Sequence, residues 1–346
     1  MRAELQSLHS AIPAAMNARR QWHSRHAVRL YLSDGSGHIG VGEAAPLPGM
    51  STETAAQARE ALAQLAWPDE PPRRTTEIAR IIAQISPSLP SARFAAETAL
   101  ASLMTSKLGV PLFTMWTDRV AEVPIASGLW GMDDHALVAA AREAAAYGVP
   151  AVKVKIGRSS ALDLGLLHAV REVLPHTELR LDANGTLDPD TLDERLAELA
   201  PFSPSFLEEP CAFEHLETRG SNPIPFALDE SLARPDGDDV LARALTCDAM
   251  KVVVLKPTLL GGLTRCWILA QKARDAGRRV VISHLMEGPI SRAAAAHLAL
   301  ALGPEAAGLG DHPALAPLAD GLTTPWIDSC WISPPELPGL GLELSF

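Results

Sequence analysis

Cysteine is scarce in this sequence, and the cysteines that occur are not paired. Four are scattered along the 346 residues, and no two of them form a CxxC pair: Cys211, Cys247, Cys266 and Cys330. This spacing argues against a disulfide framework and against a zinc site. We expect all four to be reduced and to pack as small apolar side chains.

Long uncharged apolar runs are missing as well. No run approaches the roughly 18 residues that suggest a membrane span, and the stretch MRAELQSLHSAIPAAMNARRQW has no apolar core followed by a cleavage site. Hydrophobic residues still make up 47% of the chain, which is enough for a sizeable core. We therefore expect a cytoplasmic protein that has no membrane partner.

Positive charge is in deficit. The chain has 30 lysines and arginines against 41 aspartates and glutamates, which gives a formal net charge of -11. Proteins that bind a phosphate backbone concentrate lysine and arginine on one face, so we expect no nucleic acid partner. An anionic substrate would need a local positive site. The sequence carries no signal for an oligomeric state.

The pattern of the chain changes near residue 120. Before it, strand-like runs at 26–34 and 38–44 share a DGSG turn, and helical segments follow around 53–66 and 92–108, which is an α+β pattern. After it, short β-branched runs alternate with helical segments rich in alanine and leucine, which predicts βα units and a parallel sheet. The proline-rich segment after residue 312 has no helical period, and we expect it to pack back on the first part.

The βα pattern predicts enough strands for a barrel. Eight strands are expected, the last of them weakly: 123–127, 151–156, 178–183, 204–208, 225–229, 250–256, 280–284 and 307–310.

Polar residues recur at the ends of these strands, where barrels of this kind place their active sites. Five neighbouring strands each contribute one residue, 21 to 27 residues after the previous one, and the five are Lys155, Asp182, Glu208, Asp229 and Lys256. Successive side chains of a strand point to opposite faces, so Lys153 shares a face with Lys155, and Asn184 shares one with Asp182. The spacing predicts that all of them meet at one mouth of the barrel.

The three acids among them predict a metal site. Carboxylates on three adjacent strands would lie within a few ångström of one another, which is unfavourable unless a cation neutralises them. Oxygen ligands favour a hard ion, and Mg²⁺ fits best because it keeps positions open for water or substrate. We therefore predict that Asp182, Glu208 and Asp229 hold Mg²⁺, with Mn²⁺ as a substitute.

The lysines then have a chemical role in the prediction. A carbon beside a carboxylate is a very weak acid, but a metal on that carboxylate stabilises the negative charge that develops when the proton leaves. A lysine kept neutral by neighbouring positive charge can remove that proton. The sequence thus predicts an enzyme that acts on a small-molecule carboxylate, with its lysines facing the barrel interior.

The motifs KVK, LDANG, EEP, LDES and LKP stand in this order along the chain, which resembles the enolase superfamily and, within it, the muconate-lactonizing subgroup. The resemblance implies an α/β fold, a modified (β/α)7β TIM-type barrel over residues 120–312. It also implies an α+β capping domain, formed by residues 1–119 and completed by residues 313–346. The segment GEAAPLPGM (42–50) would then be a loop over the barrel mouth.

The resemblance assigns the central residues of the site. It makes Asp182, Glu208 and Asp229 the metal ligands and Lys155 the base. Lys256, on the opposite face, either stabilises the intermediate or acts as a second base.

Four more residues receive a role by resemblance. Lys153 and Ser283 are expected to bind the substrate, while Asn184 and Glu230 are expected to support the metal ligands. One stretch departs from the expected pattern. ISHLMEGPISR places His284 and Glu287 where smaller or hydroxyl-bearing residues are expected, which puts substrate contacts there in question.

Three stretches, GEAAPLPGMSTET, FLEEPC and VVVLKPTLLGG, are similar to the o-succinylbenzoate synthases of menaquinone biosynthesis. That likeness implies a lyase that dehydrates 2-succinyl-6-hydroxy-2,4-cyclohexadiene-1-carboxylate to 2-succinylbenzoate. An N-acylamino acid racemase or a dipeptide epimerase of the same superfamily remains open, because both lysines are present. A non-catalytic binding protein is disfavoured because no residue of the set is disabled.

Overall fold

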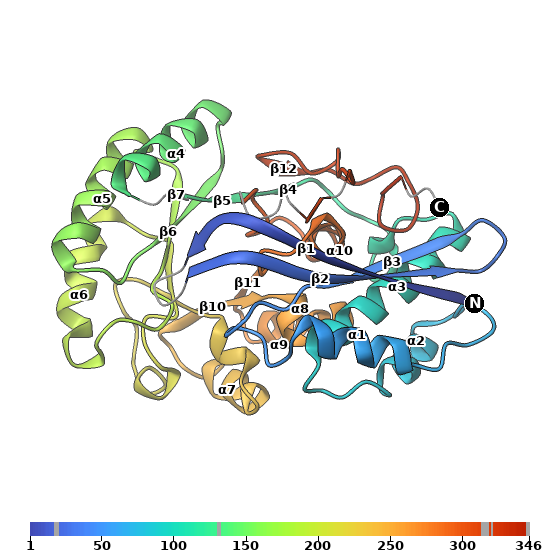
Figure 1. Ribbon diagram of the computed structural model, residues 1–346. Helices are drawn as coiled ribbons and strands as arrows, with labels where there is room; N and C mark the ends of the chain where they lie inside the picture. Colours follow the sequence, from blue (N-terminus) through green and yellow to red (C-terminus); the bar gives the residue numbers. More distant parts are fainter. Residues whose placement is uncertain (17–20, 130–132, 313–317, 320, 344–346) are drawn as a thin grey trace.

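The computed structural model describes residues 1–16, 21–129, 133–312, 318–319 and 321–343. A three-stranded antiparallel sheet with its helices forms one side of the molecule, and a curved parallel sheet surrounded by helices forms the other (Figure 1). The first sheet contains β1 (Arg2–Met16), β2 (Gln21–Ser33) and β3 (Ile39–Ala44). Its helices are α1 (Ala55–Gln64), α2 (Thr75–Ile82) and α3 (Pro90–Leu108).

Two glycines allow β3 to lie directly on α3. A Cβ atom added at Gly40 would lie 2.0 Å from the carbonyl oxygen of Ala99, and one added at Gly42 would lie 1.9 Å from that of Ala95. Real Cβ atoms do not approach this closely, so only glycine fits at these two positions. The close contact leaves α3 buried along most of its length.

The parallel sheet contains seven strands in the order β11-β10-β9-β8-β7-β6-β5, so neighbours in space are neighbours in the chain. The strands are β5 (Ala126–Gly128), β6 (Ala151–Lys155), β7 (Glu178–Asp182), β8 (Phe206–Glu208), β9 (Phe226–Leu228), β10 (Met250–Leu255) and β11 (Arg279–Ile282). The weak strand predicted near 307–310 closes the barrel through isolated bridges, in which Ala307 pairs with Ile125 and Gly308 with Ser283. The predicted barrel with a capping domain is confirmed.

Helices follow most barrel strands, as βα units require. They are α4 (Asp134–Tyr147), α5 (Ser160–Val173), α6 (Leu192–Leu199), α7 (Gly237–Ala244), α8 (Pro257–Leu260), α9 (Leu263–Asp275) and α10 (Pro289–Leu302). Short 3₁₀ turns complete the connections: η1 (Leu112–Met115), η2 (Pro189–Thr191), η3 (Ala200–Phe202), η4 (Phe213–His215) and η5 (Glu230–Ala233).

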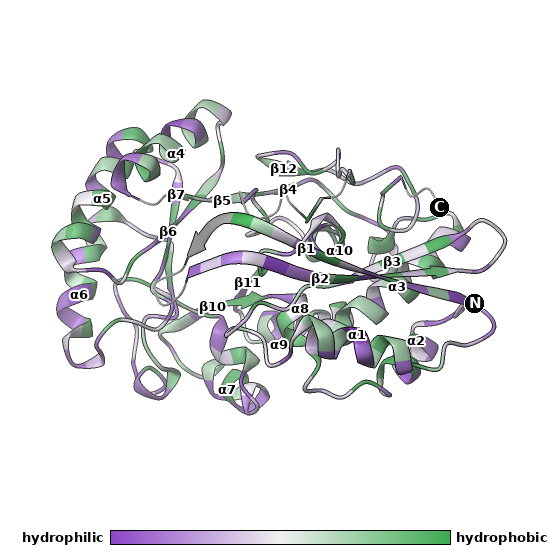
Figure 2. Cartoon of the chain, in the orientation of Figure 1, coloured by the Kyte–Doolittle hydropathy of each residue, from purple (hydrophilic) through white to green (hydrophobic). Residues whose placement is uncertain are grey.

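The burial of these helices depends on where they lie. The outer helices α4, α5 and α6 mix hydrophilic and hydrophobic residues (Figure 2), because one face covers the sheet and the other meets solvent. Helix α10 is buried almost throughout, since it packs against β11, β3 and η1. It therefore forms part of the seam between the barrel and the antiparallel sheet.

The C-terminal segment returns to the first part of the chain, as predicted. Its strand β12 (Trp331–Ile332) pairs antiparallel with β4 (Val123–Pro124). Further on, the carbonyl of Gly339 accepts a hydrogen bond of 2.7 Å from the Leu112 N–H, and the Gly339 N–H donates one of 2.9 Å to the Val110 carbonyl. The segment thus packs on the chain that follows α3. The domain boundaries near residues 120 and 312 stay predictions.

The sequence patterns do not predict β1 or α2. Strand β1 is an edge strand whose side chains are mostly exposed or half-buried, so it lacks a clear apolar alternation. Helix α2 is short and follows a proline-rich run. The cysteines are all free, as expected. No helix in the described ranges is long and apolar enough to cross a membrane.

Candidate active site

Charged side chains from five strands form the floor of a pocket at the carboxyl ends of the barrel strands. Three of them lie side by side because the strand register pairs Lys155 with Asp182 and Asp182 with Glu208. Asp229 directly follows β9, and Lys256 directly follows β10. The structure therefore brings together the five residues that the spacing predicts at one mouth.

The two lysines of β6 contact the acids of the next strands. Lys153 Nζ lies 2.6 Å from Glu208 Oε1 and 2.9 Å from Asp182 Oδ2. Lys155 Nζ lies 3.2 Å from Asp182 Oδ2 and donates a hydrogen bond of 2.8 Å to Asn184 Oδ1. Both lysines therefore point into the barrel mouth, as the alternation of side chains along the strand predicts. Each keeps part of its side chain exposed to the pocket.

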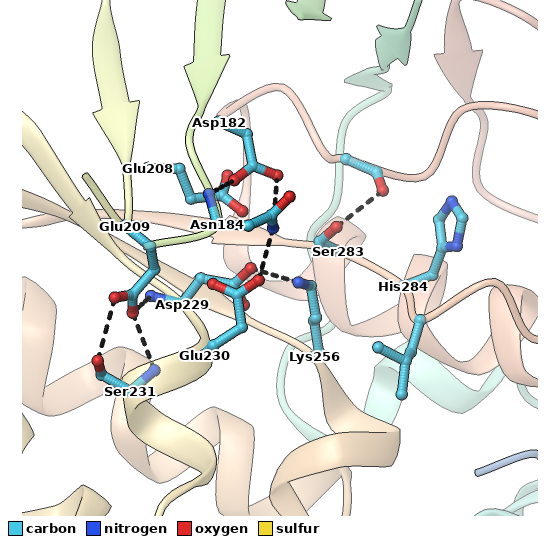
Figure 3. A network of polar contacts seen from close by, with 12 residues as sticks. Asp182, Asn184, Glu208, Glu209, Asp229, Glu230, Ser231, Lys256, Ser283 and His284 are labelled. Carbon is cyan, nitrogen blue, oxygen red and sulfur yellow. Dashed lines mark hydrogen bonds and ion pairs between the residues drawn. The ribbon is translucent and has the colours of Figure 1, made fainter. Parts of the chain in front are cut away.

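The third lysine approaches from β10, on the far side of the acids. Lys256 Nζ donates to Asp229 Oδ2 within a buried ion pair (Figure 3). Burial disfavours the charged form of Lys256, but Asp229 and Glu230 outweigh that effect and raise its pKa. Burial raises the pKa of Asp229 well above its usual range despite Lys256, and the carboxylates of Glu230 and Glu208 add to the rise. Negative charge is therefore in excess at this end of the floor.

At the opposite end of the floor, lysines balance the negative charge of the acids more fully. Burial raises the pKa of Asp182, but the nearby ammonium groups of Lys153 and Lys155 outweigh it and hold that pKa well below its usual range. Burial likewise acts against charged Lys153, and Asp182 and Glu208 outweigh it and raise the pKa of Lys153. These ion pairs keep the Asp182 carboxylate ionised and ready to bind a cation.

The carboxylate oxygens of the three predicted ligands suit Mg²⁺, although they do not converge on one point. In the part of the chain that the structure describes, no three His, Cys, Asp or Glu side chains are arranged to hold a metal ion. The ammonium groups explain this, because Lys153 bridges Asp182 and Glu208 while Lys256 holds Asp229. Three buried carboxylates on adjacent strands still offer the oxygen ligands that Mg²⁺ prefers. They stay our predicted ligands.

Asn184 and Glu230 lie where supporting residues should. The Asn184 N–H donates to Asp182 Oδ1 at 2.9 Å, and Asn184 Nδ2 donates to Glu230 Oε1 at 2.7 Å (Figure 3). Asn184 has a φ of 45°, a conformation that asparagine tolerates better than most residues. Their supporting role stays a prediction, which these contacts favour.

Glu209 is a buried acid beside the site that receives no role from the sequence. Its carboxylate accepts hydrogen bonds from the Asp229 N–H at 2.8 Å, the Ser231 N–H at 2.9 Å and the Ser231 hydroxyl at 3.0 Å (Figure 3). Burial, together with nearby Glu230, raises its pKa to about 7. Glu209 therefore fixes the segment that carries Asp229. The only signal in the sequence is the EEP motif, which places a second acid directly after Glu208.

Apolar side chains from two distant parts of the chain cover the floor. Trp22, Leu47 and Met50 come from the capping side, and Leu285 and Met286 come from the loop after β11. These side chains pack together in one cluster. Leu47 and Met50 belong to GEAAPLPGM, so this segment lies over the barrel mouth, as the resemblance implies. We call these five residues the roof.

Ser283 and His284 line the pocket but use their polar atoms within the protein. The Ser283 hydroxyl donates to the Gly308 carbonyl at 3.1 Å (Figure 3). His284 Nδ1 accepts from the Met286 N–H at 2.9 Å, so the proton lies on Nε2, which donates to the Gly310 carbonyl at 3.2 Å. Burial lowers the pKa of His284 to about 3, so the ring is neutral. His284 thus ties the loop after β11 to the closing segment, and the role of Ser283 in substrate binding stays a prediction.

Glu287, the other unexpected residue, lies beneath the same loop. It is buried, and its Oε2 accepts a hydrogen bond from the Leu285 N–H. Its carboxylate lies near the guanidinium of Arg25 from β2. Burial raises its pKa. Glu287 therefore shapes the loop rather than the pocket wall.

The segment that closes the barrel turns its acid away from the pocket. Asp311 is 69% exposed and pairs with Arg292 at 2.8 Å. The acids that line the pocket in the described ranges all lie on the floor: Asp182, Glu208 and Glu230. The walls and roof therefore offer no carboxylate in the described ranges.

Comparison with known proteins identifies the family. The sequence model described as Enolase C-terminal domain-like matches residues 136–345. The chain is 31% identical over 283 residues to the o-succinylbenzoate synthase of Aliivibrio salmonicida, an alignment that covers 80% of this chain and 78% of that protein. This chain belongs to the enolase superfamily. Since its relatives are enzymes of this superfamily, we conclude that the chain is an enzyme.

Other proteins similar to this enolase-superfamily enzyme include a second synthase, an epimerase and a lactonizing enzyme. It is 38% identical over 169 residues to the o-succinylbenzoate synthase of Thermobifida fusca, covering 47% of this chain and 51% of that protein. A dipeptide epimerase from Methylococcus capsulatus, complexed with Mg and the dipeptide L-Arg-D-Lys, superposes with a TM-score of 0.87 at 26% identity, covering 99% and 98% of the two chains. The muconate lactonizing enzyme of Pseudomonas putida shares the fold, with a TM-score of 0.80 at 21% identity over 99% and 96% of the chains.

Proposed function

We propose that this enzyme is an o-succinylbenzoate synthase. It would be a Mg²⁺-dependent carbon–oxygen lyase that dehydrates 2-succinyl-6-hydroxy-2,4-cyclohexadiene-1-carboxylate to 2-succinylbenzoate in menaquinone biosynthesis. The curated relatives with this activity, at 31% and 38% identity, support the proposal.

The observation that carries the proposal is the charge pattern of the pocket. Lys153 and Lys155 stay partly exposed beneath an apolar roof, so the pocket suits an anionic substrate with a hydrophobic ring. Among the described residues the acids lie on the floor, and Asp311 pairs with Arg292 outside the pocket. A dipeptide carries an ammonium group, and in the described ranges the walls and roof of the pocket offer no carboxylate to bind it.

In this proposal Lys155 is both base and acid. In its neutral form it removes the proton from the ring carbon that bears the carboxylate. The electron pair left behind forms the new ring double bond as the carbon–oxygen bond breaks. The Lys155 ammonium then donates its proton to the departing hydroxyl on the same face, which leaves as water. The product ring is aromatic, so the loss of water is strongly favourable.

The other groups of the floor stabilise charge. Lys256 comes from β10 and stays protonated across the floor from Lys155, where it attracts the anion that forms during proton removal. Lys153 orients the carboxylate of the substrate. Mg²⁺ bound by Asp182, Glu208 and Asp229 would supply the neutralisation of the charge that develops on that carboxylate.

A second activity, racemisation of an N-acylamino acid or epimerisation of a dipeptide, is favoured by one observation. Lys155 and Lys256 approach from β6 and β10 on opposite sides of the acids, so each could exchange a proton on its own face. The likeness to a dipeptide epimerase at 26% identity points the same way. An N-acylamino acid has no ammonium group and would suit this pocket better than a dipeptide.

A substrate panel tests the proposal. The purified enzyme with Mg²⁺ is given the cyclohexadiene carboxylate, a set of N-succinyl amino acids and a set of dipeptides, and kcat/KM is measured for each. The cyclohexadiene should give the highest value, with weaker turnover of N-succinyl amino acids and none of dipeptides. A higher kcat/KM for any amino acid derivative would replace the proposal with the second activity.

A further inference from the structure

Arg25 is a fully buried cation that joins the capping side to the barrel. Its guanidinium donates three hydrogen bonds, each to a backbone carbonyl: Nη2 to Ala45 at 2.7 Å, Nη1 to Pro46 at 2.9 Å and Nε to Met286 at 3.0 Å. The first two carbonyls belong to GEAAPLPGM, and the third belongs to the loop after β11. One side chain therefore holds two loops that lie about 240 residues apart in the chain.

The two loops held by Arg25 are those that carry most of the roof. Leu47 and Met50 follow Pro46 within the first loop, and Leu285 and Met286 belong to the second. Met286 has a φ of 56°, a conformation that a side chain larger than glycine adopts only when its surroundings hold it there. The hydrogen bond from Arg25 to the Met286 carbonyl is one contact that does so.

Buried acids compensate the charge of Arg25 and hold the same two loops. Glu287 and Glu43 lie close enough to attract the guanidinium. Glu43, in β3 just before the first loop, accepts a hydrogen bond of 2.7 Å from the Gly288 N–H of the second loop. A Cβ atom at Gly288 would lie 2.5 Å from the Glu43 carboxylate, so glycine is needed for this contact.

We propose that Arg25 is a positioning residue that fixes the roof over the catalytic floor and thereby sets the affinity for the substrate. Arg25 does not line the pocket, and its guanidinium contacts neither the lysines nor the acids of the floor. Its fork of donors is what lets it reach three carbonyls at once, which a lysine cannot do. Losing it should weaken binding of the ground state and the transition state equally. The substrate in this inference rests on the proposed function.

The variant Arg25→Lys tests the proposal because it keeps the charge and loses the fork. KM for the cyclohexadiene carboxylate should rise about tenfold while kcat stays within about twofold. Arg171→Lys is the matched control. Arg171 of α5 likewise donates to several backbone carbonyls, those of Phe202, Leu174 and Thr177, and it does not line the pocket. This control should lower thermal stability without changing KM.

Hydrogen exchange provides a readout that does not depend on the substrate. Amide hydrogens of residues 45–51 and 284–288 should exchange about tenfold faster in Arg25→Lys and at the wild-type rate in Arg171→Lys. If Arg25→Lys does not fold, the double variant Arg25→Gln/Glu287→Gln removes the hydrogen bonds of Arg25 to the two loops without leaving a charged Glu287 unpaired. The same rise in KM and the same faster exchange are expected in that variant. Unchanged exchange in both segments, or an equal rise in KM in the control, would overturn the proposal. Faster exchange with no turnover by the wild type would instead overturn the proposed function alone.

Discussion

Single residues decide the chemistry of the floor through their charges. Four acids, Asp182, Glu208, Asp229 and Glu230, share the floor with three lysines. Burial and like charge raise the pKa of Asp229, whereas the ammonium groups of Lys153 and Lys155 overcome burial and hold that of Asp182 low. A divalent cation would relieve the excess negative charge and compete with the ammonium groups for the same oxygens.

Removing one predicted ligand should remove the response to metal. A ligand that binds only the folded state raises the free energy of unfolding, by about 3 kcal/mol when its concentration is 100 times its Kd. We expect Mg²⁺ to raise the Tm of the wild type and to leave Asp182→Asn, Glu208→Gln and Asp229→Asn unchanged. The control Glu217→Gln, which alters a surface ion pair with Arg243, should keep the full Mg²⁺ response. An undiminished response in Asp182→Asn would remove Asp182 from the predicted ligands.

Proton exchange should separate the roles that we propose for Lys155 and Lys256. A chiral N-succinyl amino acid incubated with the enzyme in deuterated water exposes its α-proton to one face or the other. In Lys155→Ala, one enantiomer should lose α-proton exchange while the other still exchanges, and Lys256→Ala should show the reverse. Mass spectrometry of each recovered enantiomer measures this. Equal exchange of both enantiomers in either variant would contradict the assignment of one lysine to each face.

At the scale of elements, the repeat of strand and helix explains what the sequence could predict. Parallel neighbouring strands bring equivalent positions together, so a spacing of one βα unit predicts that Lys155, Asp182 and Glu208 meet. The alternation of β6 predicts that Lys153 joins them. These predictions need only the period of the chain, and the structure places the side chains accordingly.

Contacts between distant elements could not be predicted from the sequence. The bond of His284 to Gly310, the hydrogen bonds of Glu209 to Ser231 and the hold of Arg25 on Met286 each join residues from different loops. No local pattern encodes such pairs, because they depend on how loops of irregular shape meet. For the same reason, the roles of His284 and Glu287, which depart from the expected pattern, could not be read from the sequence.

The packing of β3 on α3 gives a prediction about glycine. Gly42→Ala places a methyl group against the Ala95 carbonyl and should lower the free energy of unfolding by about 3 kcal/mol. Gly165→Ala is the matched control, because Gly165 lies in α5 with no atom within 4 Å of an added Cβ. That change should raise the free energy of unfolding by about 1 kcal/mol. Urea denaturation measures both, and equal effects would contradict the close approach.

At the scale of the whole molecule, the C-terminal segment and α10 hold the two sheets together. His297 of α10 lies at this seam, where its Nδ1 accepts a hydrogen bond of 3.2 Å from the Phe113 N–H and its ring packs against Trp326. Burial lowers its pKa to about 3. The folded protein therefore keeps His297 neutral in a range where the unfolded chain protonates it.

This difference predicts a loss of stability in acid. The unfolded chain binds a proton at His297 below about pH 6.5, and the folded protein does so only near pH 3, so stability falls as the pH drops between these values. His297 alone should cost about 2 kcal/mol between pH 7 and pH 5. In urea denaturation, His297→Gln should lose about 2 kcal/mol less than the wild type over this range. The exposed control His135→Gln should lose as much as the wild type, and an identical loss in His297→Gln would contradict the account.

The central claim is that the enzyme, with Mg²⁺ bound, eliminates water from the cyclohexadiene carboxylate and that Lys155 is the base and acid of this reaction. Its most direct test is ultraviolet monitoring of the diene, with Mg²⁺ present, for the wild type, Lys155→Ala and the Arg171→Lys control. The wild type and the control should consume the diene and form 2-succinylbenzoate, and Lys155→Ala should slow the reaction at least about a thousandfold. No turnover by the wild type, or undiminished turnover by Lys155→Ala, would contradict the claim.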